Sequence, residues 1–219
     1  MALDPDLPLE ELAVALAPHI ALSAVFDGWT MTAVDAAAGA MGINPAVARL
    51  AYRNGATDMI GAWVAHIDAA MVEALPAPAL AALPIRERIA RLIRFRLDQL
   101  VGREEALRRA MAIMAMPQNL AAALRLGWAS ADAMWRQAGD TATDYNHYTK
   151  RVTVATIYAA TLTVFANDSG AEHRETNAFL DRRIDDVMRF ERAKARMTKP
   201  RDDRFSLVRL AGRLRYPAR

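Results

Sequence analysis

Apolar residues recur every three or four positions over most of this 219-residue sequence, and the strict alternation of a half-buried strand is scarce. Ala and Leu dominate, and Pro or Gly interrupts the pattern at helix-length intervals. This periodicity is that of amphipathic helices, so it predicts an all-α protein. The predicted helices span 8–26, 31–41, 45–54, 57–75, 84–101, 103–115, 117–138, 143–167, 172–197 and 203–216.

The helix predicted over 143–167 differs from the others because residues 152–166 carry no charge. A helix that is apolar on every side is typically buried, so we expect this one to be the central helix. Gly139 follows the preceding apolar segment, where we expect the left-handed conformation that ends a helix. Thr141 and Thr143 are candidate N-caps of the helix that follows.

Residues 34–45 have the pattern of a helix-turn-helix, with an apolar helix, a Gly-containing turn and a second helix capped by Asn44. The pattern resembles the N-terminal domain of TetR regulators. However, residues 1–80 contain nine acidic residues against Arg49 and Arg53, a net charge of −7, while the rest of the chain carries +10. DNA phosphates repel such a domain, so we do not expect DNA binding and interpret the motif as a structural part of the fold.

The start of the uncharged helix combines polar and aromatic residues in an unusual order. Residues 138–151 read Ala-Gly-Asp-Thr-Ala-Thr-Asp-Tyr-Asn-His-Tyr-Thr-Lys-Arg. With Asp168-Ser169 and residues 179–184, Phe-Leu-Asp-Arg-Arg-Ile, they resemble the signature of the ninth-named coenzyme Q biosynthesis protein family. The similarity is dense over about 110–190. One departure is His147, where the family usually has Trp.

This resemblance implies a lipid-binding accessory factor with a TetR-like fold, in which a helix-turn-helix-type bundle precedes a larger helical ligand-binding domain. The ligand implied is an isoprenoid lipid, including quinone intermediates of the ubiquinone pathway. The partner implied is the di-iron hydroxylase of that pathway, to which the lipid is presented.

Met and aromatic residues on the predicted helices 103–115 and 117–138 face the central helix in this scheme. Met adapts to irregular space, and clefts between helices commonly bind small molecules. Ordinary core packing gives the same spacing. The candidate lipid-pocket residues are Met111, Met114, Leu124, Trp128, Trp135, Tyr158, Leu162 and Phe165.

The resemblance also implies a partner-binding surface at the start of the central helix. The candidate residues are Asn146, His147, Tyr148 and Arg151. An exposed Tyr beside a flat polar ring suits an interface hot spot, although simple helix packing explains these residues equally well. Imidazole in place of indole reduces the apolar area and makes the contact sensitive to pH.

We expect no catalysis, metal or cofactor. The four His residues lack metal-ligand spacing, Cys is absent, and no nucleophile elbow, P-loop or dinucleotide motif is present. Asp140 and Asp144 lie one turn apart and could pair as acid and base, but capping of the helix start explains them better.

Six Arg and two Asp give residues 201–219 a net charge of +4. Basic amphipathic helices bind anionic membranes, and a solvated basic tail is the alternative. The candidate membrane-binding residues are Leu207, Arg209, Leu210, Arg213 and Leu214.

We predict three regions: a helix-turn-helix-like domain over 1–75, a helical lipid-binding domain over 76–198, and a basic amphipathic helix over 199–219. The acidic N-terminus is unlike a secretory or mitochondrial leader, so we expect a bacterial-type cytoplasmic protein, peripheral on the inner membrane surface. By analogy with TetR-like folds, the apolar stripe of 172–197 forms a homodimer interface or packs on its own chain. The alternative function is a TetR-type transcriptional regulator with a small apolar effector.

Overall fold

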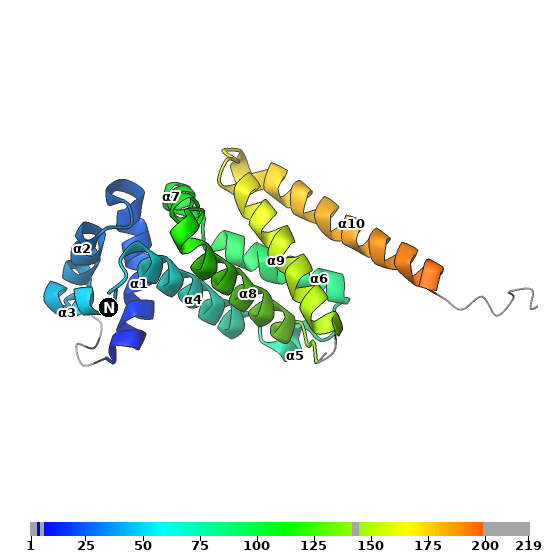
Figure 1. The fold of residues 1–219 in the computed structure, drawn as a ribbon, viewed down its shortest axis with the longest axis horizontal. Coiled ribbons are helices and arrows are strands. Elements are labelled where there is room, and N and C mark those ends of the chain that lie inside the picture. Colours follow the sequence, from blue (N-terminus) through cyan, green and yellow to red (C-terminus); the bar gives the residue numbers. More distant parts are fainter. Residues whose placement is uncertain (1–3, 5–6, 142–144, 199–219) are drawn as a thin grey trace, which may run out of the picture. The chain divides into compact units, whose positions relative to one another are not determined.

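The computed structural model describes residues 4, 7–141 and 145–198, and over these residues every regular element is helical (Figure 1). This confirms the all-α prediction. The elements are α1 Leu9–Asp27, α2 Met31–Met41, α3 Pro45–Leu50, α4 Ala56–Ala74, α5 Ala77–Leu80, α6 Ile85–Asp98, α7 Glu104–Met114, the 3₁₀ turn η1 Pro117–Asn119, α8 Leu120–Gln137, α9 Tyr145–Phe165, the 3₁₀ turn η2 Ala171–His173, and α10 Arg174–Thr198.

The predicted helices agree with these elements to within a few residues, with two differences. The short helix α5 is an addition, and α3 ends at Leu50 instead of reaching residue 54. Asn54 instead donates its backbone and side-chain N–H groups to the Asp58 carboxylate, at 2.7 and 3.1 Å, which organises the start of α4. The helix predicted over 203–216 lies outside the described residues.

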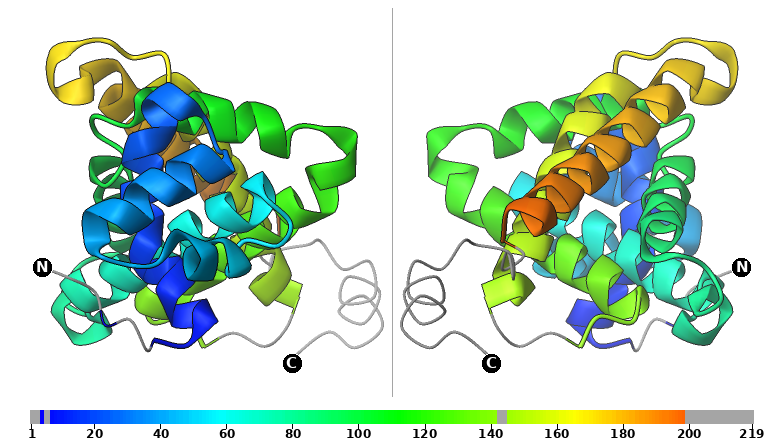
Figure 2. Two further views of the ribbon diagram at one scale, coloured as in Figure 1. Left: turned by 90° about the vertical axis from the view of Figure 1, so that its left-hand side faces the viewer. Right: turned by 90° about the vertical axis from the view of Figure 1, so that its right-hand side faces the viewer.

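The N-terminal helices α1, α2 and α3 pack together at one end of the first unit of the chain, residues 1–184, and face the viewer in the left panel of Figure 2. Gly42 ends α2 with a left-handed φ of 75°, and the Asn44 side chain accepts a hydrogen bond from the N–H of Ala46 at 2.9 Å. The predicted helix-turn-helix geometry and its N-cap are therefore confirmed. Tyr52, which follows α3, is buried, and its hydroxyl donates to the carbonyl of Ala13 on α1 at 2.8 Å.

Among the described helices, α1 alone has the length and composition of a membrane-crossing segment. That is weak evidence, because the core helix of a globular protein meets the same test. Leu12, Leu16 and Ile20 are fully buried, and α1 packs against α2 and α4.

The chain divides into two compact units, residues 1–184 and 185–219. In the first unit α8 lies between α4 and α9, and the first turns of α10 bury Leu180 and Ile184 (Figure 1). In the second, α10 continues to Thr198 and carries an ion pair of Arg189 with Asp186 at 3.9 Å. The predicted boundaries near 75 and 198 stay predictions.

Helix α9 is not buried on every side, so that part of the prediction is wrong. Val152, Thr156, Ala159 and Thr163 form one exposed face. The Thr156 hydroxyl donates to the carbonyl of Val152 at 2.8 Å, and that of Thr163 to Ala159 at 3.1 Å. The Thr hydroxyls therefore find hydrogen-bond acceptors in the backbone of the helix itself. An exposed face of this kind can be free of charged residues.

Candidate functional site

An apolar cavity of about 370 Å³ lies inside the first unit, among α4, α6, α7, α8 and α9. Small-molecule sites commonly have volumes of about 300–1,000 Å³ and predominantly apolar walls. The wall consists of Ile60, Trp63, Val64, Ile67, Arg96, Leu100, Leu107, Ala110, Met111, Met114, Ala115, Leu120, Ala123, Leu126, Gly127, Ser130, Ala155, Tyr158, Ala159 and Leu162.

Some of the wall residues are exposed and mark where the cavity opens. Ala115, Leu120 and Ala159 line it and also reach the surface, with Leu120 53% exposed. The mouth therefore lies between the start of α8 and the middle of α9. Trp63 and Leu100 line the opposite, buried part.

One charged side chain contributes to this wall. Arg96 of α6 is only 1% exposed, forms an ion pair with Asp68 of α4, and donates from Nη2 to the Ser130 hydroxyl at 3.0 Å. Ser130 in turn donates to Asp68 at 3.2 Å. The guanidinium carbon lies 4.8 Å from the centre of the Tyr158 ring, a cation–π distance. We call these four residues the polar cluster.

Sequence analysis did not identify the polar cluster, since no motif singles out Arg96, Asp68, Ser130 or Tyr158 as a group. The spacing of apolar residues along α6 nevertheless indicates that Arg96 is buried. Ile89 and Ile93 are buried, and Arg96 lies seven residues after the first and three after the second, which places it on the same face of the helix.

The structure places only half of the eight candidate pocket residues in the cavity wall. Met111, Met114, Tyr158 and Leu162 line the cavity, whereas the other four lie elsewhere. Phe165 is buried against the His173 ring at 4.4 Å, and Trp135 is buried with its indole N–H donating to the carbonyl of Lys150 at 2.9 Å. Leu124 is 67% exposed.

The remaining candidate, Trp128, lies at the surface with two residues of α9. Its ring centre is 6.3 Å from that of His147 and 5.9 Å from that of Tyr148, and the latter two are 5.2 Å apart. We call these three rings the aromatic cluster. Tyr148 is 59% exposed, and Asn146 beside it is also exposed.

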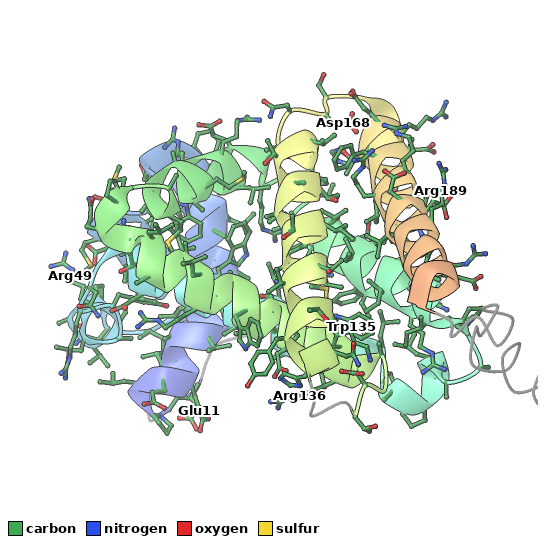
Figure 3. All side chains as sticks on the ribbon, turned by 45° about the vertical axis from the view of Figure 1, so that its right-hand side comes forward. Glu11, Arg49, Trp135, Arg136, Asp168 and Arg189 are labelled. Carbon is green, nitrogen blue, oxygen red and sulfur yellow. The ribbon has the colours of Figure 1, made fainter. Side chains whose placement is uncertain are left out.

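Arg151, predicted to belong to the partner surface, is buried instead, with 2% exposure. Its Nε donates to Asp132 of α8 at 2.6 Å, and its Nη1 lies 3.2 Å from Asp140, which also pairs with Lys150 at 2.6 Å. These four residues, the buried ion cluster, join the end of α8 to the start of α9. The end of α8 is visible in Figure 3, where Trp135 and Arg136 are labelled.

The turn before this cluster contains Gly139, whose φ of 86° confirms the predicted left-handed residue. Of the two carboxylates considered as an acid–base pair, Asp140 belongs to the buried ion cluster. Asp144 and the candidate cap Thr143 lie outside the described residues, as do all five candidate membrane-binding residues.

At the other end of α9, Asp168 organises the turn into α10 (labelled in Figure 3). It accepts hydrogen bonds from the Thr176 N–H at 2.9 Å, the Thr176 hydroxyl at 2.7 Å and the Gly170 N–H at 3.0 Å. These bonds, led by that of the Thr176 N–H, lower the pKa of the Asp168 carboxyl below its ordinary value of 3.8.

The site thus consists of an apolar cavity with one polar cluster and an aromatic surface beside its mouth. Over the described ranges, no group of three or more acidic or His side chains could hold a metal ion. What the arrangement offers is space for an apolar ligand and a surface for a partner.

The family model COQ9 matches residues 120–191, which include α8, α9 and most of α10. The matched segment contributes one side of the cavity and the whole aromatic cluster. The chain is 33% identical over 168 residues to the mitochondrial ubiquinone biosynthesis protein COQ9 of Rattus norvegicus, covering 74% of this chain and 54% of the rat protein. The chain resembles the COQ9 family.

The human COQ9 protein is 30% identical over 168 residues, which cover 74% of this chain and 52% of the human protein. The chain therefore spans about half the length of these curated COQ9 relatives. Among solved structures, a TetR transcriptional regulator from Nitrosomonas europaea is similar, with a TM-score of 0.62 and 20% identity. The match covers 83% of this chain and 98% of the regulator, and it shows that the all-α fold is TetR-like.

Proposed function

We propose that this protein is a non-catalytic accessory factor of ubiquinone biosynthesis that binds an isoprenoid quinone intermediate in the cavity. The observation that carries the proposal is the cavity itself, which has an apolar wall and a mouth at the surface. Burying apolar ligand surface there is favourable by about 25 cal/mol per Å². The names of the curated relatives supply the pathway.

A cavity of about 370 Å³ is at the small end of ligand sites, so it holds only part of a long isoprenoid chain. An exposed apolar strip continues from the mouth and accommodates the rest. On α8 it runs from the exposed Leu120 and Leu124 to the half-buried Trp128, each four residues after the last. On α9 it includes Val152, which is 55% exposed. Both sides of the strip end at the aromatic cluster.

The aromatic cluster is the proposed contact for the di-iron hydroxylase of the pathway, to which the lipid is presented. Exposed aromatic residues are typical interface hot spots, and Trp128 supplies an indole ring beside His147. Tyr148→Ala is expected to weaken binding of the purified hydroxylase at least about tenfold. Unchanged binding in a titration would count against this surface.

The cavity is tested by mass spectrometry of an organic extract, using protein purified from quinone-producing cells. We expect an isoprenoid quinone or precursor at close to one molecule per chain. The variant Gly127→Leu fills the cavity from α8, because Gly127 lines it and a Cβ there meets no atom within 4 Å. We therefore expect the extracted lipid to fall severalfold in this variant.

Gly39→Leu is the matched control. Gly39 is also helical with nothing within 4 Å of its Cβ, but it lies on α2, away from the cavity. It should retain the lipid. An extract that contains only mixed phospholipid, or equal lipid in both variants, would rule out the proposed cavity function.

The alternative, a transcriptional regulator with an apolar effector, has the TetR-like fold in its favour. Two observations oppose it. The first 80 residues carry −7, and Arg49 of the short helix α3 is paired with Asp35. Neutralised in this way, Arg49 is less available to a DNA phosphate.

A further inference from the structure

Exposed apolar side chains surround the mouth of the cavity. Met116 precedes η1, and Leu120 and Leu124 lie on the first two turns of α8; these side chains are 44%, 53% and 67% exposed. Val152 of α9 is 55% exposed. In both views of Figure 2 the green turn that joins α7 to α8 projects from the first unit. Exposed apolar side chains gathered in one place usually mark a binding surface.

The segments on both sides of the mouth contain no acidic residue. Neither 106–131 nor 145–167 includes an Asp or Glu, although the chain has 25 acidic residues. Over 112–125, all of which the structure describes, Arg125 is the one exposed residue that carries a charge. Anionic lipid head groups repel carboxylates and attract Arg and Lys side chains. The charge around the mouth therefore suits an anionic bilayer.

Other exposed apolar residues have acidic neighbours. Phe26, which is 84% exposed near the end of α1, is followed by the exposed Asp27. Leu50, which is 54% exposed at the end of α3, lines a hollow together with Glu10 and Asp58. An anionic bilayer would be repelled from both places. This difference distinguishes the mouth from these two apolar surfaces.

The proposed ligand is a membrane lipid, so it has to leave a bilayer before it reaches the cavity. Passage through water would expose its apolar surface at a cost of about 25 cal/mol per Å². A mouth that touches the bilayer avoids this cost. Leu120 belongs both to the cavity wall and to the exposed surface, so an apolar path leads from the surface into the cavity.

On the basis of the proposed cavity function, we propose that an entry face around the mouth rests on an anionic bilayer while the lipid is taken up. The entry face consists of Met116, Leu120, Leu124 and Arg125. Its apolar side chains insert between acyl chains, and Arg125 contacts lipid phosphates. Because tails lie below head groups in a bilayer, the mouth takes up the isoprenoid tail. The head group stays at the surface, where it is presented to the partner.

The test follows the loading of the full chain from phosphatidylcholine vesicles that contain phosphatidylglycerol and ubiquinone. After each interval the vesicles are removed by centrifugation, and the quinone bound to the protein is quantified. If uptake requires contact, the loading rate should rise in proportion to the vesicle concentration. Arg125→Glu and Met116→Glu each place a carboxylate on the entry face, so each should slow loading at least about fivefold.

Two variants serve as matched controls. Arg53→Glu makes the same charge change at an exposed position of the acidic end, and Phe26→Glu replaces an exposed apolar residue there. Both should load from vesicles at the wild-type rate. None of the four substituted residues lines the cavity. All four variants should therefore take up the same amount of ubiquinone from detergent micelles, which also shows that each is folded.

Contact with the bilayer can be measured directly, because the chain contains no Cys and a single one can be labelled. A nitrobenzoxadiazole fluorophore on Leu124→Cys should shift its emission to shorter wavelength when vesicles are added. The same label on Phe26→Cys should not respond.

The outcomes separate the two proposals. If the wild-type protein takes up no ubiquinone from micelles or vesicles, the cavity function fails. If micelles load the protein but the vesicle rate is the same in wild type, Arg125→Glu and Met116→Glu, the entry face is not the route. A loading rate that does not depend on vesicle concentration would show that the lipid crosses water. A label at residue 124 that responds to the hydroxylase but not to vesicles would assign this face to a protein partner instead.

Discussion

At the scale of single residues, the Arg side chains of this protein have two different roles. Arg49 pairs with Asp35 at the surface, where such pairs contribute little to stability. Arg96 and Arg151 are buried with 1% and 2% exposure, and each contacts Asp residues on a neighbouring helix. Breaking a buried pair leaves a charge without a partner, so these two positions tolerate substitution far less.

The first prediction concerns the buried ion cluster. Asp140→Asn keeps the size of the side chain but removes the charge that Arg151 and Lys150 share. We expect the free energy of unfolding to fall by about 3 kcal/mol, measured by urea denaturation. Asp35→Asn, which breaks the surface pair with Arg49, is the control and should cost clearly less. Equal losses would show that Asp140 is not part of a desolvated network.

The sequence located the chemistry of this region but not the depth of each side chain. It singled out residues 138–151, yet Arg151 is buried and Trp128 belongs to the surface cluster. Periodicity assigns a residue to a face of a helix, whereas burial depends on which helix covers that face. For Trp128 that neighbour is the start of α9, and the contact joins rings on two different helices. Packing of this kind is set by tertiary structure and leaves no local pattern.

At the scale of elements, the presence of each long helix was predictable, because apolar residues that recur every three or four positions over a long segment are typical of a helix and not of a strand or loop. The ends of the helices depended on individual hydrogen bonds. Asp58 draws Asn54 away from α3, so that helix stops early. The uncharged sequence of α9 suggested complete burial, but Thr156 and Thr163 satisfy their hydroxyls on its exposed face. Lack of charge is therefore a weaker sign of burial where Thr is frequent.

The second prediction concerns the start of α10. Asp168 accepts hydrogen bonds from the N–H and hydroxyl of Thr176, in the first turn of the helix, where N–H groups lack helical partners. Asp168→Asn weakens these charge-assisted bonds, and we expect a loss of about 1 kcal/mol at pH 7, measured by urea denaturation. Asp181→Asn, an exposed carboxylate on the same helix, is the control.

The contribution of the Asp168 carboxylate to the free energy of unfolding should decrease in acid. Its pKa is lower in the folded protein than the ordinary value of 3.8, so the unfolded chain binds the proton more tightly. The stabilisation is present above pH 3.8 and is lost as pH falls through the folded pKa. The difference between wild type and Asp168→Asn should therefore shrink as the pH falls below 3.8. A difference that grows in acid would show that the carboxylate is not the stabilising form.

At the scale of the whole molecule, the sequence left two alternatives for the last long helix. The apolar stripe of 172–197 was assigned either to a homodimer or to its own chain. Leu180 and Ile184 of this stripe are buried within the first unit, so they are not available to a second copy. The homodimer stays a prediction, which sedimentation equilibrium of the full chain will test.

The last prediction follows from the uneven charge of the chain. Residues 1–80 carry −7, whereas 201–219 carry +4 and contain the five candidate membrane-binding residues. If this segment holds the protein on a bilayer, removing residues 199–219 should weaken binding to phosphatidylcholine vesicles containing phosphatidylglycerol at least about tenfold, since each basic residue contributes about 1 kcal/mol. Binding of the full chain should also fall with added salt, because salt screens the attraction.

Arg49→Gln removes a cation from the acidic end and should leave vesicle binding unchanged in cosedimentation. If the shortened chain sediments with the vesicles as the full chain does, residues 199–219 are not the membrane contact, and the exposed strip beside the cavity becomes the surface to test.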